Sequence, residues 1–114
     1  MKTQLKKGAL ELCVLAVLAR GDSYAYDIVN QLSRSMEISE GTVYPLMRRL
    51  QDEAWVNTYL VESSTGPSRK YYRLTPAGET ALAAMQTEWR EFVSEIDSVL
   101  AAPSPTETRL PKES

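Results

Sequence analysis

A row of large apolar residues near the carboxyl end is the feature that most constrains this chain of 114 residues. Its members are three or four residues apart, so in an α-helix they lie along one stripe, as in the a/d seam of a coiled coil. A domain this small has little room to bury the whole stripe, and the simplest cover is the matching stripe of a second copy, in a two-fold homodimer. The alternative is a helix that folds back onto its own core. The stripe consists of Leu82, Met85, Trp89, Phe92, Ile96 and Val99.

Several classes of protein are excluded by residues that the chain lacks. Histidine is absent, and Cys13 is the only cysteine. A histidine-based catalytic triad, a histidine metal ligand, an intrachain disulfide and a thiolate cluster are therefore impossible. We also find no glycine-rich phosphate loop and no well-spaced pair of carboxylates. We predict that the chain is not an enzyme and uses no metal and no cofactor.

The chain also lacks an apolar run of the roughly 20 residues that a membrane span needs. Its amino-terminal stretch has no clear signal-type apolar segment followed by a cleavage site. We therefore expect a cytoplasmic protein with no membrane partner.

Charge is divided unevenly along the chain, although the net charge is only −2. Residues 1–75 contain ten Lys and Arg against eight Asp and Glu, a balance of +2. Residues 76–114 contain three against seven, a balance of −4. A weakly basic amino-terminal part and an acidic carboxyl-terminal part are typical of a protein that binds an anionic partner through one part of its surface.

Three helices are expected in the first half of the chain. Ser23 is a candidate N-cap for the second of them, because its hydroxyl can accept a bond from a free backbone N–H. Pro45 falls inside the third, where it removes one backbone hydrogen bond. The helices span residues 5–19, residues 24 to about 34, and a third from its N-cap Ser39 to about residue 53.

Two strands and a final helix are expected in the second half. Residues 55–62 and 69–74 are rich in aromatic and β-branched residues, and the segment between them has a turn composition, which predicts a hairpin. Thr75 and Pro76 are typical of the start of a helix. We predict an α+β fold that is mainly α. It consists of a winged helix-turn-helix DNA-binding domain over residues 1–75, a C-terminal dimerisation helix over 76–101 and a disordered tail over 102–114.

This order of elements is typical of proteins that place the third helix in the major groove of DNA and lay the hairpin, or wing, on the neighbouring backbone. A small α+β domain without a DNA partner has the same order. The alternatives are separable by experiment, because DNA binding that neutralises phosphates weakens as salt rises.

Two sequence blocks, with two supporting stretches, form a specific combination of motifs. The blocks are Gly41-Thr42-Val43-Tyr44-Pro45-Leu46 and Arg69-Lys70-Tyr71-Tyr72-Arg73-Leu74-Thr75, supported by Leu5-Lys6-Lys7-Gly8-Ala9-Leu10-Glu11-Leu12 and Tyr24-Ala25-Tyr26-Asp27-Ile28. Together they resemble the PadR family of bacterial transcriptional regulators, in its small subgroup with one C-terminal helix. The resemblance covers residues 5 to about 100 and implies homodimers that bind operator DNA, usually as repressors, with small-molecule effectors in some members.

The chain departs from the family pattern at two positions. Ala25 and Ala54 stand where the family usually has glycine. If position 54 requires a left-handed backbone, alanine costs about 1 kcal/mol there. We expect instead that the end of the third helix is shifted.

The candidate DNA-binding residues come from the third helix, the wing and the amino-terminal lysines. Arg48 and Arg49 have two open roles, bidentate pairing with guanine or contact with phosphate. Tyr44 either contacts DNA or packs beneath the helix, and Tyr24 either donates its hydroxyl to a phosphate, as the resemblance suggests, or packs in the core. The full set is Lys6, Lys7, Tyr24, Ser39, Thr42, Tyr44, Arg48, Arg49, Arg69 and Lys70.

A candidate effector site lies on the apolar stripe. By counting from Leu74-Thr75, Trp89 aligns with the tryptophan that flanks the drug pocket in multidrug-responsive members of the family. The resemblance thus implies a small aromatic effector between Trp89, Met85 and Phe92. The alternative is that Trp89 simply fills the core of the dimer.

We predict a homodimeric repressor that an effector releases from double-stranded operator DNA. The alternatives are a constitutive DNA binder and a winged-helix protein-interaction module.

Overall fold

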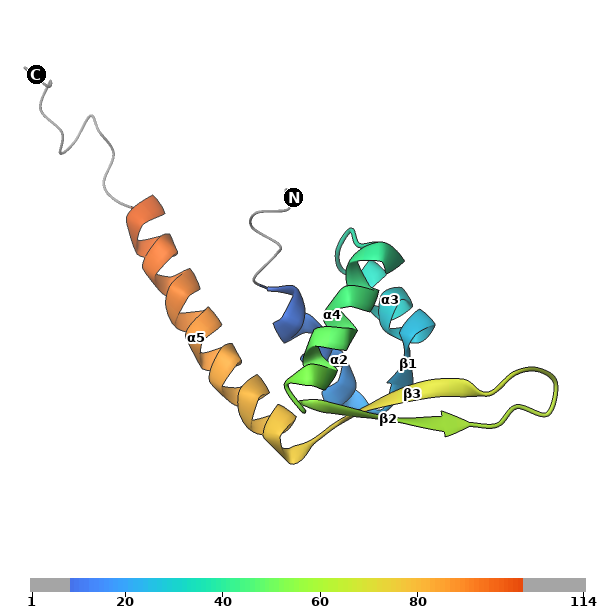
Figure 1. Cartoon of the computed structure of the whole chain (residues 1–114). Helices are drawn as coiled ribbons and strands as arrows, with labels where there is room; N and C mark the ends of the chain where they lie inside the picture. The colour runs from blue at the N-terminus through green and yellow to red at the C-terminus, as the bar shows by residue number, and fades with distance from the viewer. Residues whose placement is uncertain (1–8, 102–114) are drawn as a thin grey trace, which may run out of the picture.

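The computed structural model of the protein describes residues 9–101. Three helices lie above a small sheet whose hairpin extends away from them, and a long last helix leads off to one side (Figure 1). This arrangement confirms the predicted winged helix-turn-helix class, mainly α with a small antiparallel sheet. The elements are α2 (Leu10–Arg20), β1 (Ser23–Tyr24), α3 (Ala25–Ser33), α4 (Glu40–Asp52), β2 (Val56–Val61), β3 (Arg69–Leu74) and α5 (Pro76–Leu100).

The core forms where α2, α3 and α4 meet the sheet. α2 is buried along most of its length and contacts α3, α5 and β3, as expected of a helix that is apolar almost all round. Part of the predicted first helix, residues 5–8, lies outside the described residues. The side chains with almost no exposed surface include Val14, Leu15, Ile28, Val43, Met47, Leu50 and Val56.

The sheet contains one strand that the sequence did not predict. Ser23 and Tyr24 form β1, which pairs antiparallel with β3, so the strand order is β1-β3-β2. The prediction that Ser23 caps the second helix was wrong. Its hydroxyl donates to the carbonyl of Gly21 at 3.3 Å, and the N-cap of α3 is Tyr24, without a side-chain capping bond. The local sequence around Ser23 fits both a helix N-cap and a short strand. Pairing with β3, which is distant in the sequence, makes it a strand.

α4 begins after Ser39, as predicted, and runs through Pro45 without interruption. The Ser39 hydroxyl makes no capping bond to the backbone and lies 3.3 Å from the Thr42 hydroxyl. Pro45 is exposed, so water can satisfy the Gly41 carbonyl that would otherwise accept its missing N–H. The opposite face of α4, formed by Val43, Met47 and Leu50, is buried.

The end of α4 corrects a second prediction. The helix ends at Asp52, and Ala54 has φ 63°, so the end is not shifted and alanine adopts the left-handed conformation. The N–H of Ala54 donates to the Gln51 carbonyl at 2.9 Å, and the N–H of Trp55 donates to the Leu50 carbonyl at 3.0 Å. This pair of bonds is the Schellman motif, which requires a left-handed residue at position 54.

The predicted hairpin is present, with β2 slightly shorter than expected and β3 as expected. Tyr59 on β2 lies opposite Tyr71 on β3, and Val56 lies opposite Leu74. Successive side chains point to opposite faces of the sheet, so Tyr72 and Val56 are buried towards the helices while Tyr59 and Tyr71 lie on the other face.

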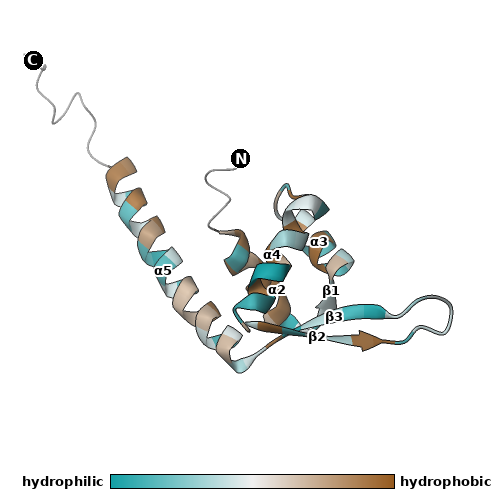
Figure 2. Cartoon of the chain, in the orientation of Figure 1, coloured by the Kyte–Doolittle hydropathy of each residue, from teal (hydrophilic) through white to brown (hydrophobic). Residues whose placement is uncertain are grey.

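α5 starts as the sequence predicts. The Thr75 hydroxyl accepts a hydrogen bond from the Gly78 N–H at 2.9 Å, and Pro76 occupies the first turn. Within residues 9–101, only the beginning of the stripe packs against the core, through Leu82 and Met85. Trp89, at 43% exposed, and Phe92, at 54%, are followed by the exposed Ile96 and Val99. Figure 2 shows apolar residues continuing to the far end of α5.

Two further observations concern the ends of the chain and membranes. The predicted tail, residues 102–114, lies outside the described residues. Among the helices of residues 9–101, none combines the length and the apolar character that a membrane span requires.

Replacing Ala54 with glycine should stabilise the protein. We expect Ala54→Gly to raise the free energy of unfolding by about 1 kcal/mol, because glycine has no Cβ to oppose the left-handed conformation. Denaturant unfolding followed by circular dichroism measures this. Ala25→Gly is the matched control, since Ala25 is the first residue of α3 and has no positive φ. Equal or lower stability of Ala54→Gly would contradict the account of this turn.

Candidate nucleic-acid interface

A cleft of about 400 Å³ separates the exposed face of α4 from the wing. Aromatic and basic side chains dominate its lining, and none of the described residues that line it is acidic. Half of the predicted DNA-binding residues meet there, although they come from separate elements. The lining consists of Tyr24, Ala25, Tyr26, Tyr44, Arg48, Gln51, Arg69, Lys70 and Tyr72.

The α4 side of the cleft follows from helical periodicity. Tyr44, Arg48 and Gln51 are four and then three residues apart, so they share one face of the helix. The face that holds Val43 and Met47 is buried and fixes the rotation of α4. Tyr44 is 46% exposed, so its ring lines the cleft rather than packing beneath the helix.

On the wing side, two cations lie over tyrosine rings. The Arg69 guanidinium carbon is 4.9 Å from the centre of the Tyr24 ring, and Lys70 Nζ is 5.8 Å from that of Tyr72. Such contacts hold a cation in place and leave N–H donors free. Arg48, Arg69 and Lys70 form no salt bridge with any residue in the described part of the chain. The cleft therefore carries three positive charges that form no salt bridge with a carboxylate of residues 9–101.

Tyr72 on β3 also lines the cleft and is almost completely buried. Burial raises the pKa of the Tyr72 phenol, the nearby Tyr44 phenol raises it further, and the Arg48 guanidinium lowers it. Tyr72 therefore stays protonated at neutral pH. Tyr72 on β3 lines the same cleft as Tyr44 and Arg48 on α4, so β3 and α4 face each other across it.

Arg49 lies apart from this group. Its guanidinium forms a salt bridge with the carboxylate of Glu11 on α2, and the Glu11 side chain is only 14% exposed. Adjacent residues on a helix point about 100° apart, so Arg48 faces the cleft while Arg49 faces α2. Ser39 and Thr42 lie at the amino-terminal end of α4 and do not line the cleft. Lys6 and Lys7 lie outside the described residues.

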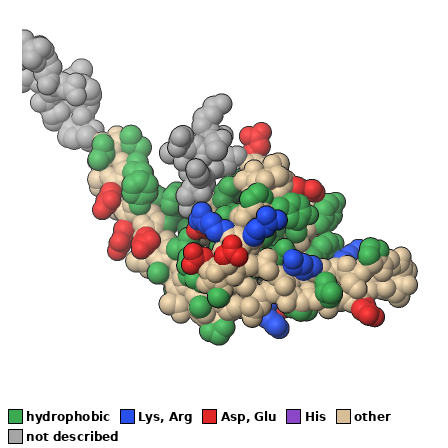
Figure 3. Space-filling model, in the orientation of Figure 1, with side chains coloured by type: hydrophobic (Ala, Val, Ile, Leu, Met, Phe, Trp, Pro, Cys, Tyr) green, Lys and Arg blue, Asp and Glu red, His purple; other side chains and the backbone are tan. Residues whose placement is uncertain are grey.

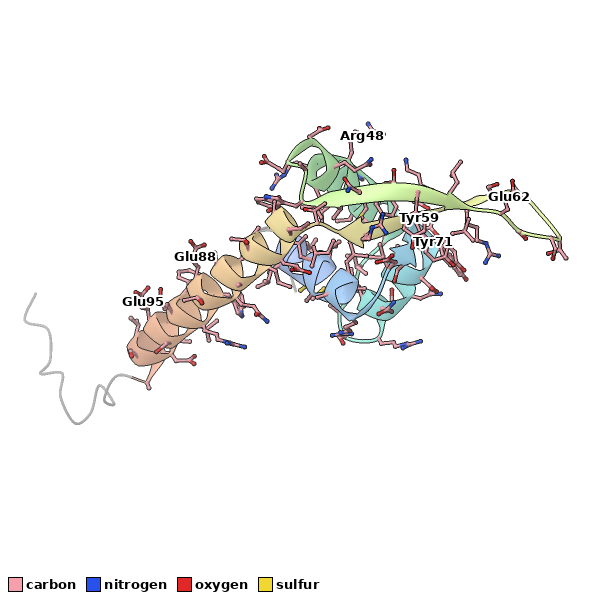
Figure 4. The ribbon with its side chains drawn as sticks, turned by 90° about the horizontal axis from the view of Figure 1, so that it is seen from below. Arg48, Tyr59, Glu62, Tyr71, Glu88 and Glu95 are labelled. Atoms are coloured by element: carbon pink, nitrogen blue, oxygen red, sulfur yellow. The ribbon has the colours of Figure 1, made fainter. Side chains whose placement is uncertain are left out.

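The outer face of the sheet carries a second group, which sequence reasoning missed. Tyr71 contacts Tyr24 and Tyr59, with ring centres 5.4 and 5.8 Å apart. The Arg73 guanidinium lies 4.9 Å from the centre of the Tyr59 ring. Figure 4 shows Tyr59 and Tyr71 together at the hairpin and Arg48 beyond β2 on α4. The alternation of β3, which puts Arg69, Tyr71 and Arg73 on one face, is the signal that could have revealed this group.

One carboxylate anchors this group to the start of the sheet. The Tyr59 hydroxyl donates to Asp22 Oδ2 at 2.6 Å, and this hydrogen bond is the main cause of the raised pKa of Tyr59. Asp22 precedes β1 and Tyr59 lies on β2, so the bond crosses the whole sheet. It ties the wing to the body of the domain.

A winged helix with a basic cleft between its third helix and its wing defines a DNA-binding protein. Residues 14–84 match the transcriptional regulator PadR-like family, and the chain belongs to that family. Its members are transcriptional regulators rather than enzymes.

Individual relatives agree with this assignment. The transcriptional regulator Rv3488 of Mycobacterium tuberculosis is 30% identical over 95 residues, 82% of this chain and 87% of that protein. The crystal structure of a PadR-like transcriptional regulator from Bacillus cereus is 32% identical with a TM-score of 0.79, covering 88% of this chain and 99% of that one. That of a PadR family regulator from Eggerthella lenta is 30% identical with a TM-score of 0.80, covering 88% of each chain.

Proposed function

We propose that two copies of the chain form a dimer that represses transcription. The dimer occupies an operator and so blocks transcription from it. The observation that carries this proposal is the cleft with three cations, Arg48, Arg69 and Lys70, that form no salt bridge within residues 9–101. In the view of Figure 3 the Lys and Arg side chains lie over α4 and the hairpin, where some Asp and Glu side chains also lie, and further Asp and Glu side chains line α5. Such a regulator acts where the DNA lies, so we place it in the cytoplasm.

α4 is the recognition helix in this proposal. The helix lies in the major groove, and the wing lays Arg69 and Lys70 on the neighbouring phosphates. Arg48 is the candidate for reading a base, because its guanidinium is exposed on the cleft face and free of salt bridges. Arg49 supports the position of α4 through its salt bridge with Glu11, and so affects binding to all sequences alike.

The exposed part of the stripe supports the dimer. Trp89, Phe92, Ile96 and Val99 occupy successive positions of one helix face and lack cover within the described chain. Exposed apolar surface of this extent on a small protein marks a site of association. The matching stripe of a second copy covers it and gives a two-fold dimer with two recognition helices.

A shallow depression supports a small-molecule effector as a second element of the proposal. It measures about 240 Å³ and is lined by Leu12, Met85, Glu88, Trp89 and Phe92. A planar aromatic compound stacked on Trp89 would alter the packing of α5 and so the placement of the recognition helices.

Quenching of Trp89 fluorescence by ethidium, measured in a Trp55→Phe background, tests for such binding. Unchanged fluorescence with ethidium, and with a panel of planar aromatic compounds, would favour a constitutive DNA binder.

Removing the wing cations should weaken binding to every DNA sequence about equally. For Arg69→Ala combined with Lys70→Ala, the plot of log affinity against log salt should flatten by about one unit for each phosphate that the variant no longer neutralises. Fluorescence anisotropy over a salt series measures both effects. Arg20→Ala with Arg34→Ala removes the same charge outside the cleft and should leave the slope nearly unchanged. An unchanged slope in the wing variant would remove the wing from the interface.

Substitution of the two arginines of α4 should have different effects on DNA binding. Arg48→Ala should change which bases are preferred, at about 1–3 kcal/mol per base pair read. Arg49→Ala should lower affinity for all sequences alike. Binding of each variant to a set of singly substituted operators separates the two effects. The assignment fails if Arg49→Ala alters base preference and Arg48→Ala does not.

A charge on the exposed stripe should dissociate the dimer. The wild-type protein should sediment at about twice the chain mass of 12.8 kDa, and Phe92→Lys should sediment as a monomer, because a buried unpaired charge is strongly unfavourable. Ser94→Lys is the matched control on the same helix, on a different face from the stripe. A monomeric wild-type protein, or a dimeric Phe92→Lys variant, would contradict the proposed dimer.

A further inference from the structure

The end of α4 and the start of α5 meet at a junction built around the Thr75 hydroxyl. This hydroxyl donates to the Ala54 carbonyl at 2.8 Å and accepts from the Gly78 N–H at 2.9 Å. The Thr75 N–H donates to the Trp55 carbonyl at 3.0 Å. One side chain therefore bonds the turn that ends α4 and the first turn of α5.

Gly78 allows the first turn of α5 to pack closely against the backbone of Trp55. It is buried, and a Cβ at this position would overlap the Trp55 carbonyl oxygen and lie 2.7 Å from Leu74 Cδ1. The first turn of α5 thus rests directly on the backbone that follows α4. On the other side of the junction, the Schellman motif holds Ala54 in the left-handed conformation and so fixes the backbone where α4 ends.

We propose that Thr75 is a positioning residue that fixes the angle between α4 and α5, and that it thereby sets the spacing of operator half-sites that the dimer accepts. The second part rests on the dimer proposed above. α5 carries the stripe that pairs the two copies, and α4 carries the cleft cations. The angle between them sets the separation of the two recognition helices, which must match half-sites about one helical turn, or a multiple, apart.

Three substitutions separate the two bonds of the hydroxyl. Thr75→Ser retains both. Thr75→Asp can still accept from the Gly78 N–H and cap α5, but its carboxylate cannot donate to the Ala54 carbonyl. Thr75→Val has nearly the same shape and makes neither bond. Circular dichroism verifies that each variant folds, and Thr75→Asp keeps the test valid if Thr75→Val does not.

The first measurement is independent of DNA and of dimer formation. Spin labels at Asp52→Cys on α4 and Ser94→Cys on α5, in a Cys13→Ala background diluted with unlabelled protein, report the distance between the two helices of one chain. We expect a narrow distance distribution for the wild-type sequence and Thr75→Ser, and a broad one for Thr75→Asp and Thr75→Val. A narrow distribution in Thr75→Asp would overturn the role of the bond to Ala54.

The second measurement uses operators whose half-sites are moved apart one base pair at a time. The wild-type protein and Thr75→Ser should prefer one spacing. In Thr75→Asp this preference should fall by roughly five-fold, the factor associated with one hydrogen bond, while binding to an isolated half-site is unchanged. Equal weakening at every spacing would overturn the inference. If the wild-type protein itself shows no spacing preference, the dimer proposal and its consequence for spacing fail, while the label distances still decide what Thr75 does.

Discussion

Burial of one face of α4 is the interaction on which the rest of this structure depends. Val43, Met47 and Leu50 are almost completely inaccessible and pack in the same core as Leu15 and Ile28. Each such side chain contributes roughly 1.5–3 kcal/mol when it leaves water. Rotation of α4 about its axis would expose them, so the direction of every other side chain on the helix is fixed. Tyr44, Arg48 and Gln51 consequently face the wing.

The same core explains why neighbouring arginines have different surroundings. Arg48 meets the cleft, whereas Arg49 meets Glu11 on α2. Positive charge is thereby concentrated between α4 and the wing, although the chain as a whole is slightly acidic. The acidic residues of α5, among them Glu88 and Glu95 in Figure 4, lie on a separate projecting helix. In the proposed function, this division of charge would attract a polyanion to the cleft and repel it from α5.

Local patterns predicted those parts of the fold that depend on nearby residues. The pattern that follows Ser39 predicted α4 and where it begins, and Thr75-Pro76 predicted the start of α5. Features that depend on distant partners were missed. Ser23 has the chemistry of a helix cap, and only pairing with β3 makes it part of a strand. Ala54 is a poor left-handed residue, and the bonds of the helix end hold it there.

The candidate site shows the same division. The position of Arg69 and Lys70 on the wing could be predicted from the hairpin pattern alone. Arg48 and Arg49 could not be distinguished, because the difference between them is a carboxylate from another helix. Gln51, Tyr26 and Arg73 were missed because neither block of the family resemblance gave them a role. Their places follow from the alternation of strands and the periodicity of helices once the partner elements are known.

The most direct test of the account is selection of bound sequences from a pool of random double-stranded DNA by the full-length protein. Two recognition helices related by a two-fold axis should enrich an inverted repeat whose half-sites are centred about one helical turn, or a multiple, apart. Enrichment of a single asymmetric site, or of no sequence at all, would contradict it.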